Sequence, residues 1–339
     1  MIDLSPASYR QQRYTFDGDA AAEIRMASDQ DEVVEAVLEA VPARFLEAIV
    51  LIGGYGRGDG GYVETAAGGV APFNDYDYFL VFKDCSPAQA KRLCAGIDCH
   101  QLERRTGVEV DFFPLMTAEL AHLEYSLMYA EMQQGHRVIY GNPDVLGEME
   151  AMPLDGVSTA EFRRLMVNRG FLLLLNYSTP DPEKFSLYIN KAILAVGDSL
   201  LHEWGEYHLS LRHRLACLME RSEDEALKHF YLEAVKAKYR PDLARVWTRR
   251  ELLEVTEIWL GRMQTINAAE VKVTVKPLRM FKNLLLNLSQ PLLRPRLDRW
   301  IRHPREYLGD CLLDQLQDKA EGMGRQSDAD LIQLWHRFA

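Results

Sequence analysis

The sequence predicts an α+β protein, in which an N-terminal domain with a small mixed β-sheet and flanking helices precedes an all-helical domain. In the first half, short apolar runs typical of strands alternate with glycine turns and helical patterns. In the second half, helical patterns with capping residues follow one another, and only residues 271–275 suggest a strand. Because Gly141-Asn142-Pro143 is a strong chain break, we place the boundary near residue 150, giving domains 1–150 and 151–339.

The composition indicates an ordinary globular protein. Of the 339 residues, 47% are hydrophobic and 26% are charged, which is enough apolar material for real cores. The net charge of −11 disfavours a long nucleic acid as partner, because nucleic acids bind basic grooves. The five cysteines have no C-x-x-C spacing, the first residues carry no signal-peptide segment, and no apolar run reaches membrane-spanning length. We therefore expect a reduced, cytoplasmic protein that does not enter a membrane.

Each element of the first half is predicted from a local pattern. Residues 1–28 lack periodicity and are expected to be irregular, whereas residues 29–41 have apolar side chains at helical spacing. Residues 48–52 and 76–82 are apolar or aromatic runs that favour strands. The remaining elements are expected at residues 87–105 (helix, with Pro87 in its first turn), 108–113 (strand), 117–134 (helix) and 137–140 (edge strand). In the second half, three capping boxes mark helix starts: Ser158–Glu161, Ser222–Glu225 and Thr248–Glu251.

Residues 51–83 carry the strongest chemical signal. Glycines at positions 53, 54, 56 and 58 directly follow the first strand, so the backbone can turn tightly and approach a ligand closely. Asp75 and Asp77 are two residues apart at the start of the second strand, so both point to the same face of the sheet. Two neighbouring negative charges are unfavourable unless a cation lies between them, and oxygen ligands suit Mg²⁺.

The strings GGYGRG, NDYDYFLV and VEVDFF together resemble the nucleotidyltransferase fold of DNA polymerase β and its small bacterial relatives. The glycine string is similar to the start of the uridylyltransferase domain of the PII-modifying enzymes. That family's pattern is an apolar strand, Gly-Gly or Gly-Ser, D-x-D on the next strand, and a third carboxylate between apolar residues. The resemblance covers residues 45–115 and implies transfer of a nucleoside monophosphate from a nucleoside triphosphate (NTP) to an acceptor, releasing pyrophosphate.

The resemblance implies that three carboxylates bind metal and carry the catalysis. Asp75, Asp77 and a third acid on strand 108–113 would hold two Mg²⁺ ions, or Mn²⁺ in their place, about 4 Å apart. Glu109 and Asp111 both fit the third position, because they are two residues apart and each has apolar neighbours. We favour Asp111, because the residues that follow it can finish the strand. The other interpretation of Asp75 and Asp77 is a turn with solvent-facing acids.

Gly53, Gly54 and Arg57 are predicted to bind the triphosphate. The N–H groups of a tight turn at a helix start bind anions, and a cation nearby adds to this. For Arg57 the alternative is an ion pair with Asp59. More residues separate Gly54 from Asp75 than is usual in the family, so either residues 61–73 form an inserted hairpin or flap, or the working pair is Gly60-Gly61. We prefer the insertion, because Gly53-Gly54 follows directly on the apolar strand.

Two features of the second half could contact ligands. Lys191 is predicted to reach the triphosphate. Asp198 lies seven residues later on the same helical face, so the alternative is an internal ion pair or a solvated face. Residues 271–307 contain nine Lys and Arg residues against two acids. That stretch is open to three interpretations: a solvated helical face, a surface for an acidic partner or RNA, or a weak membrane-surface segment.

We therefore predict a Mg²⁺-dependent nucleotidyltransferase that uses ATP or another NTP as co-substrate. The acidic charge and the helical second domain, which would bind the acceptor, favour a small molecule or a protein as acceptor. Two alternatives stay open. One is a non-catalytic NTP-binding regulatory module. The other is an RNA-terminal nucleotidyltransferase, which would need a basic channel.

Overall fold

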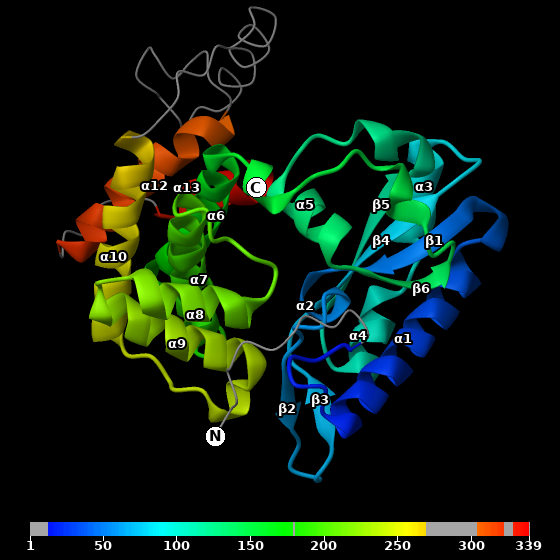
Figure 1. The fold of residues 1–339 in the computed structure, drawn as a ribbon, viewed down its shortest axis with the longest axis horizontal. Helices are drawn as coiled ribbons and strands as arrows, with labels where there is room; N and C mark the ends of the chain where they lie inside the picture. Colours follow the sequence, from blue (N-terminus) through cyan, green and yellow to red (C-terminus); the bar gives the residue numbers. More distant parts are fainter. Residues whose placement is uncertain (1–12, 179, 269–303, 322–327, 339) are drawn as a thin grey trace, which may run out of the picture. The chain divides into compact units, whose positions relative to one another are not determined.

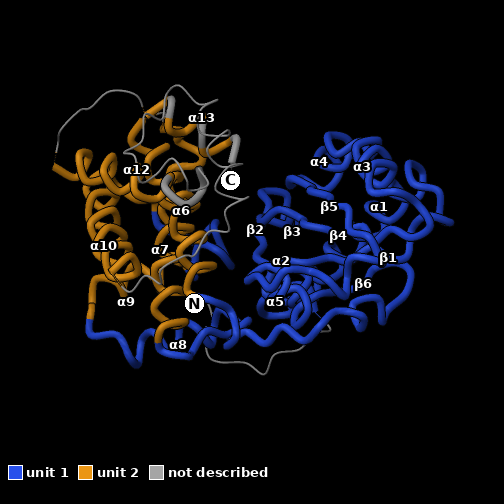
Figure 2. The backbone as a smooth tube through the Cα atoms, turned by 90° about the horizontal axis from the view of Figure 1, so that it is seen from above, with its two compact units in different colours: residues 1–158, 204–223, 235–245 blue, residues 159–203, 224–234, 246–339 orange. Residues whose placement is uncertain are grey.

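A computed structural model describes residues 13–178, 180–268, 304–321 and 328–338. The protein has the predicted α+β class, with a four-stranded mixed sheet, a separate two-stranded hairpin and many helices (Figure 1). The chain divides into two compact units, coloured separately in Figure 2. The first unit consists of residues 1–158, 204–223 and 235–245, and the second of residues 159–203, 224–234 and 246–339.

This division differs from the predicted boundary near residue 150. The chain first passes into the second unit at Thr159, and residues 204–223 and 235–245, which we expected in the helical domain, belong to the first unit. Long-range contacts hold them there, because the Asp59 carboxylate accepts hydrogen bonds from the Leu211 N–H and the Tyr239 hydroxyl, each 2.8 Å long. Such contacts leave no local pattern in the sequence, so a contiguous boundary was the simplest prediction.

The main sheet has the strand order β5-β4-β1-β6. Strand β1 pairs antiparallel with both β4 and β6, whereas β4 and β5 are parallel. The bounds are Leu46–Leu51 (β1), Tyr76–Phe82 (β4), Val110–Met116 (β5) and Arg137–Gly141 (β6). Strand β4 has the predicted bounds, and β6 is the predicted edge strand. Strand β5 begins and ends later than predicted and includes Pro114, which an edge strand tolerates.

The residues between the glycine turn and β4 form a hairpin, as predicted for residues 61–73. Strands β2 (Tyr62–Glu64) and β3 (Val70–Pro72) pair antiparallel and make a sheet of their own. The buried Tyr55 hydroxyl closes the base of this hairpin, because it donates to the Gly61 carbonyl at 2.6 Å and accepts from the Phe73 N–H at 3.0 Å. The hairpin therefore adds residues without disturbing the order of the main sheet.

Helices cover the two faces of the main sheet differently (Figure 2). Helix α1 (Ala20–Ala40) packs on one face, where the Tyr76 and Tyr78 hydroxyls donate to Asp29 and Gln30. Helices α3 (Pro87–Ala95) and α4 (Cys99–Thr106) lie on the same side. Helix α5 (Leu127–Gln134) lies on the other side, where Tyr129 packs against Phe79. Because side chains alternate along β4, this second face is the one that carries Asp77.

Three predicted helices have different bounds. Helix α1 begins at Ala20, because Asp19 caps it by accepting the Ala22 N–H and because Met26 extends its buried face. The predicted helix 87–105 is two helices, since α3 ends before Gly96 and Asp98 caps α4. The predicted helix 117–134 is a 3₁₀ segment, Thr117–His122, followed by α5. In each case a short capping side chain or a break decided the bounds.

The described part of the second unit is helical, as predicted. Its described helices are α6 (Thr159–Ser178), α7 (Phe185–Glu203), the first part of α9 (Glu225–Tyr239), α10 (Arg249–Ala268), α12 (Pro304–Ala320) and α13 (Asp328–Phe338). Trp259 of α10 is fully buried and donates its indole N–H to the Met166 carbonyl of α6 at 3.1 Å. Gly170 allows this close packing, because a Cβ there would lie 2.4 Å from the Trp259 ring.

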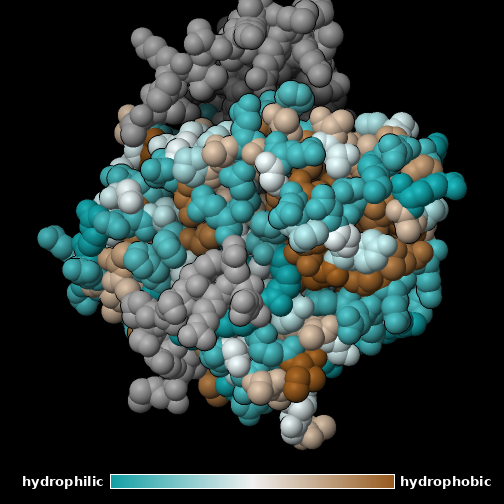
Figure 3. Space-filling view, turned by 45° about the vertical axis from the view of Figure 1, so that its right-hand side comes forward, coloured by the Kyte–Doolittle hydropathy of each residue, from teal (hydrophilic) through white to brown (hydrophobic). Residues whose placement is uncertain are grey.

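Part of the sequence prediction falls on residues that the structure does not describe. The predicted strand 271–275 and residues 271–303 of the basic stretch lie outside the described residues. Within the described residues, no helix combines the length and the apolar character needed to cross a bilayer. The face in Figure 3 is mostly hydrophilic and carries separate hydrophobic patches.

Two glycines with left-handed backbones provide a matched test of the packing at the sheet edge. Gly141 (φ 89°) ends β6, and a Cβ there would lie 2.1 Å from the Glu47 carbonyl oxygen of β1. Gly107 (φ 85°) caps α4 and has open space around its Cβ position. We expect Gly107→Ala to cost about 1 kcal/mol of unfolding free energy from backbone strain. Gly141→Ala should cost about 1–3 kcal/mol more, because β1 and β6 must separate. Urea unfolding measures both, and equal losses would contradict the packing described here.

Candidate functional site

The predicted carboxylates lie together at the start of the two parallel strands. Asp77 of β4 and Asp111 of β5 are register partners, so their side chains are neighbours on one face of the sheet. Asp75 lies two residues before Asp77 and shares this face. Adjacent strands are about 4.8 Å apart, which is close to the separation of the two metal ions in a two-metal site. The arrangement can therefore present three carboxylates to a pair of cations.

The charges of this group favour a cation. Asp75 and Asp111 are exposed and Asp77 is half-buried. Neighbouring protein atoms, which exclude part of the water, and the negative charge of Asp75 both raise the pKa of Asp111. Hard carboxylate oxygens are the donors that Mg²⁺ and Mn²⁺ prefer, so the residues present fit these ions.

The strand register favours Asp111 over Glu109 as the third carboxylate. The Glu109 carbonyl accepts the Tyr76 N–H at 2.9 Å, so Glu109 lies level with Asp75, before the start of β5. Asp111 instead lies level with Asp77, inside the strand. Both acids point to the same face, and Glu109 stays available as a further ligand.

The glycine turn lies against the carboxylates. Gly53 has φ 68°, a conformation that favours glycine, and a Cβ at this position would lie 3.2 Å from Asp77 Oδ2. The Ile52 N–H donates to the Asp77 carbonyl at 2.9 Å, which fixes the turn to the start of β4. Gly53 begins the one-turn helix α2 (Gly53–Gly56), and the first N–H groups of a helix have no acceptor within that helix.

The alternative pair, Gly60-Gly61, has a packing role. A Cβ on Gly60 would lie 2.2 Å from the Tyr55 ring, and a Cβ on Gly61 would lie 2.0 Å from the Lys238 carbonyl oxygen. Gly60 therefore allows the chain to pack on the Tyr55 ring, and Gly61 allows the hairpin base to pack on the end of α9. In the other pair, Gly53 is the glycine beside the Asp77 carboxylate. A Cβ on Gly54 would make only ordinary contacts, at 3.6 Å, with the Asp59 and Gly60 backbone.

Arg57 is held by a partner that the sequence did not indicate. Its Nη1 lies 3.1 Å from Glu131 Oε2, and the two side chains are only 11% and 22% exposed. The partner in the predicted alternative, Asp59, is wrong. The buried Asp59 carboxylate instead accepts hydrogen bonds from the Leu211 N–H and the Tyr239 hydroxyl. A contact of Arg57 with a triphosphate stays a prediction.

Glu131 is the centre of a partly buried polar cluster that includes Arg57. It also accepts a short hydrogen bond from the Tyr207 hydroxyl, and Arg214 lies near Tyr207. Burial alone would raise the pKa of Glu131, but the charges of Arg57 and Arg214 and these hydrogen bonds outweigh it, so its pKa lies below the ordinary value. Glu131, Tyr207 and Arg214 were missed because no local motif marks them.

Aromatic side chains extend from the carboxylates along the same face. Phe79 and Phe113 are register partners two residues after Asp77 and Asp111, and their ring centroids are 5.8 Å apart. Phe113 is 42% exposed, and Met128 of α5 is 48% exposed. A ligand that extends along this face beyond Asp111 would therefore meet apolar as well as charged groups.

Lys191 and Asp198 both lie on α7 in the second unit. Asp198 is buried and accepts a hydrogen bond from the Tyr231 hydroxyl at 3.0 Å, which gives it a structural role. The contact of Lys191 with a triphosphate stays a prediction.

The chain matches no protein-family model, and a comparison with curated proteins gives no match. The functional argument therefore depends on the residues and the geometry above.

The pKa of Glu131 leads to a pH-dependent test. Because its folded-state pKa is depressed, ionised Glu131 contributes stability that is complete above the ordinary value of 4.5 and is lost as the pH falls through the folded-state pKa. Glu131→Gln should therefore lower the unfolding free energy by about 3 kcal/mol at pH 7. The difference from the wild type should shrink below about pH 4. Urea unfolding at several pH values measures this, with the exposed Glu124→Gln as the control, and a loss independent of pH would contradict it.

Proposed function

We propose that this protein is a Mg²⁺-dependent nucleotidyltransferase of the DNA polymerase β type. The observation that carries the proposal is the register pairing of Asp77 with Asp111 on parallel strands, with Gly53 directly against the Asp77 carboxylate. This is the order that the family pattern requires: strand, glycine pair, D-x-D strand and third acid. The inserted hairpin β2–β3 supports it further, because it accounts for the extra residues between the glycine pair and Asp75.

The reaction would transfer a nucleoside monophosphate. An acceptor oxygen forms a bond to the α-phosphorus of the NTP, the bond from that phosphorus to the bridging oxygen breaks, and pyrophosphate leaves with the bond electrons. Asp75 and Asp77 would hold both Mg²⁺ ions, and Asp111 would hold the ion on the acceptor side and take the acceptor proton. Bound Mg²⁺ would neutralise part of the triphosphate charge and would lower the pKa of the acceptor hydroxyl.

The residues around the carboxylates would position the substrates. Gly53 and Gly54 offer backbone N–H groups to the phosphates, and glycine at position 53 keeps this turn close to Asp77. We propose that Arg57 adds positive charge behind the turn, where Glu131 fixes its position.

The acceptor is proposed to be a small molecule or a protein. The net charge of −11 disfavours a nucleic acid, and the exposed Phe113 and Met128 favour an acceptor with an apolar part. The free state of all five cysteines supports a reduced, cytoplasmic setting for the reaction.

The first experiment measures nucleotide binding. Isothermal titration calorimetry with each of the four NTPs, in Mg²⁺ and in Mn²⁺, should show binding that requires the metal. The double variant Asp75→Asn, Asp77→Asn should lose it by about 100-fold or more, because two of the three metal ligands lose their charge. Glu103→Gln, an exposed acid on α4, is the control. Equal binding by the double variant and the wild type would rule out the carboxylate site.

The second experiment identifies the third carboxylate without knowledge of the acceptor. Electron paramagnetic resonance counts the Mn²⁺ ions bound in the presence of an NTP. We expect two ions in the wild type and in Glu109→Gln, and one in Asp111→Asn, because Asp111 pairs with Asp77 in the register. The reverse result would assign the role to Glu109. Two ions bound without release of pyrophosphate, across a panel of acceptors, would favour the non-catalytic NTP-binding module.

A further inference from the structure

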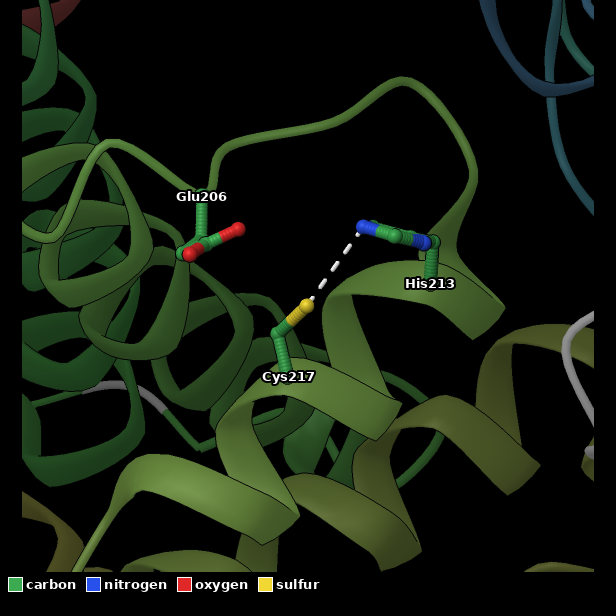
Figure 4. A group of neighbouring side chains, drawn as sticks. All are labelled: Glu206, His213 and Cys217. Atoms are coloured by element: carbon green, nitrogen blue, oxygen red, sulfur yellow. Dashed lines mark hydrogen bonds between the residues drawn. The ribbon is translucent and has the colours of Figure 1, made fainter.

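A second group of potential metal ligands lies in the first unit, on residues that the proposed reaction does not use. Glu206, His213 and Cys217 each offer one ligand atom, and these atoms all lie within 4.8 Å of one another. His213 and Cys217 come from helix α8 (Leu211–Arg221), and Glu206 comes from the loop that precedes it. In Figure 4 the three side chains converge on one spot beside the helix.

The geometry of the His–Cys pair suits a shared ion. The two residues are four positions apart on α8, so their side chains lie on the same face of the helix, one turn apart. His213 Nε2 and Cys217 Sγ are 3.4 Å apart. A tetrahedral zinc ion with ordinary bond lengths would place its nitrogen and sulfur ligands about 3.5 Å apart. The pair therefore needs almost no movement to bind one ion.

The donor set selects the class of metal. A thiolate, an imidazole and a carboxylate are typical ligands of Zn²⁺ and related transition metals, whereas Mg²⁺ prefers oxygen alone. Each of the three residues is partly exposed, so an ion can enter from solvent. We propose that Glu206, His213 and Cys217 bind one Zn²⁺ ion, with solvent in the fourth position.

The ion pair at this site is compatible with a metal. Arg221 Nη1 lies 2.9 Å from Glu206 Oε1, and both side chains are about 40% exposed. Exposed ion pairs contribute about 0–1 kcal/mol, so this one opposes metal binding only weakly. It also uses one carboxylate oxygen, and Oε2 can bind the metal while Arg221 stays in place.

A bound ion would fix the loop before α8 to the helix. Tyr207 follows Glu206 and donates to Glu131, the partner of Arg57, and the first N–H of α8 donates to Asp59. The ion would thus stabilise the segment that supports the glycine turn. Because it binds the folded state, Zn²⁺ should raise the melting temperature by mass action.

Cobalt provides the most direct test. The full-length protein, stripped with a chelator, is titrated with Co²⁺ and followed by absorption spectroscopy. We expect a thiolate-to-cobalt charge-transfer band and tetrahedral d–d bands that saturate at one equivalent. Cys217→Ser should abolish the charge-transfer band, and Cys85→Ser, which changes another partly exposed cysteine, should keep it. Co²⁺ bound by aspartates alone gives no thiolate band, so the test does not depend on the nucleotidyltransferase proposal.

A second measurement separates loss of the site from loss of the fold. His213→Gln and Glu206→Gln should weaken Co²⁺ binding by about 100-fold or more, since each removes a direct ligand. Zn²⁺ should raise the melting temperature of the wild type and of Cys85→Ser by more than that of Glu206→Gln. The proposal is overturned if the wild type gives no thiolate band, if Cys217→Ser keeps the band, or if Zn²⁺ stabilises all variants equally.

Discussion

The parallel pairing of β4 with β5 is the constraint on which the proposed chemistry depends. The backbone ladder holds Asp77 opposite Asp111 and brings Asp75 to the same face, although the three negative charges repel one another. Packing elsewhere must offset the free energy of this repulsion. The buried aliphatic strand β1 at the centre of the sheet and the helices α1, α3 and α4 on one face provide that packing. The sheet thus holds three carboxylates close together, an arrangement that a bound cation or protonation of one of them would favour.

Local sequence patterns predicted the helices and strands whose bounds depend on neighbouring residues. The bounds of β4 and the edge strand β6 follow from apolar and aromatic runs. The hairpin was instead expected from the shorter spacing between the glycine pair and the D-x-D strand in the family that the sequence resembles. The start of α1 was predicted too late, because a single capping residue, Asp19, outweighs the weak periodicity of the residues after it. The structure has two helices where one was predicted, because α3 ends before Gly96 and Asp98 caps the start of α4.

Long-range partners could not be predicted in this way. Asp59 meets Leu211 and Tyr239, which lie 152 and 180 positions later in the chain, and Arg57 meets Glu131, which lies 74 positions later. A buried acid or arginine must find a partner, so the sequence shows that partners are needed but not which ones. The same limit explains why the return of residues 204–223 and 235–245 to the first unit was not predicted, since a helix such as α8 has the same local pattern whichever unit it packs on.

The anchoring of Asp59 also affects the order of events during synthesis. Its carboxylate is buried, and its two donors arrive only when the chain has been made as far as Tyr239. Until then the first unit would carry a charged group without its hydrogen bonds, which a folded interior does not tolerate. By this argument the first unit completes its folding only after helices α6, α7 and α9 have been synthesised. A fragment cut at residue 158 would lack both groups that donate to the Asp59 carboxylate, which follows the glycine turn.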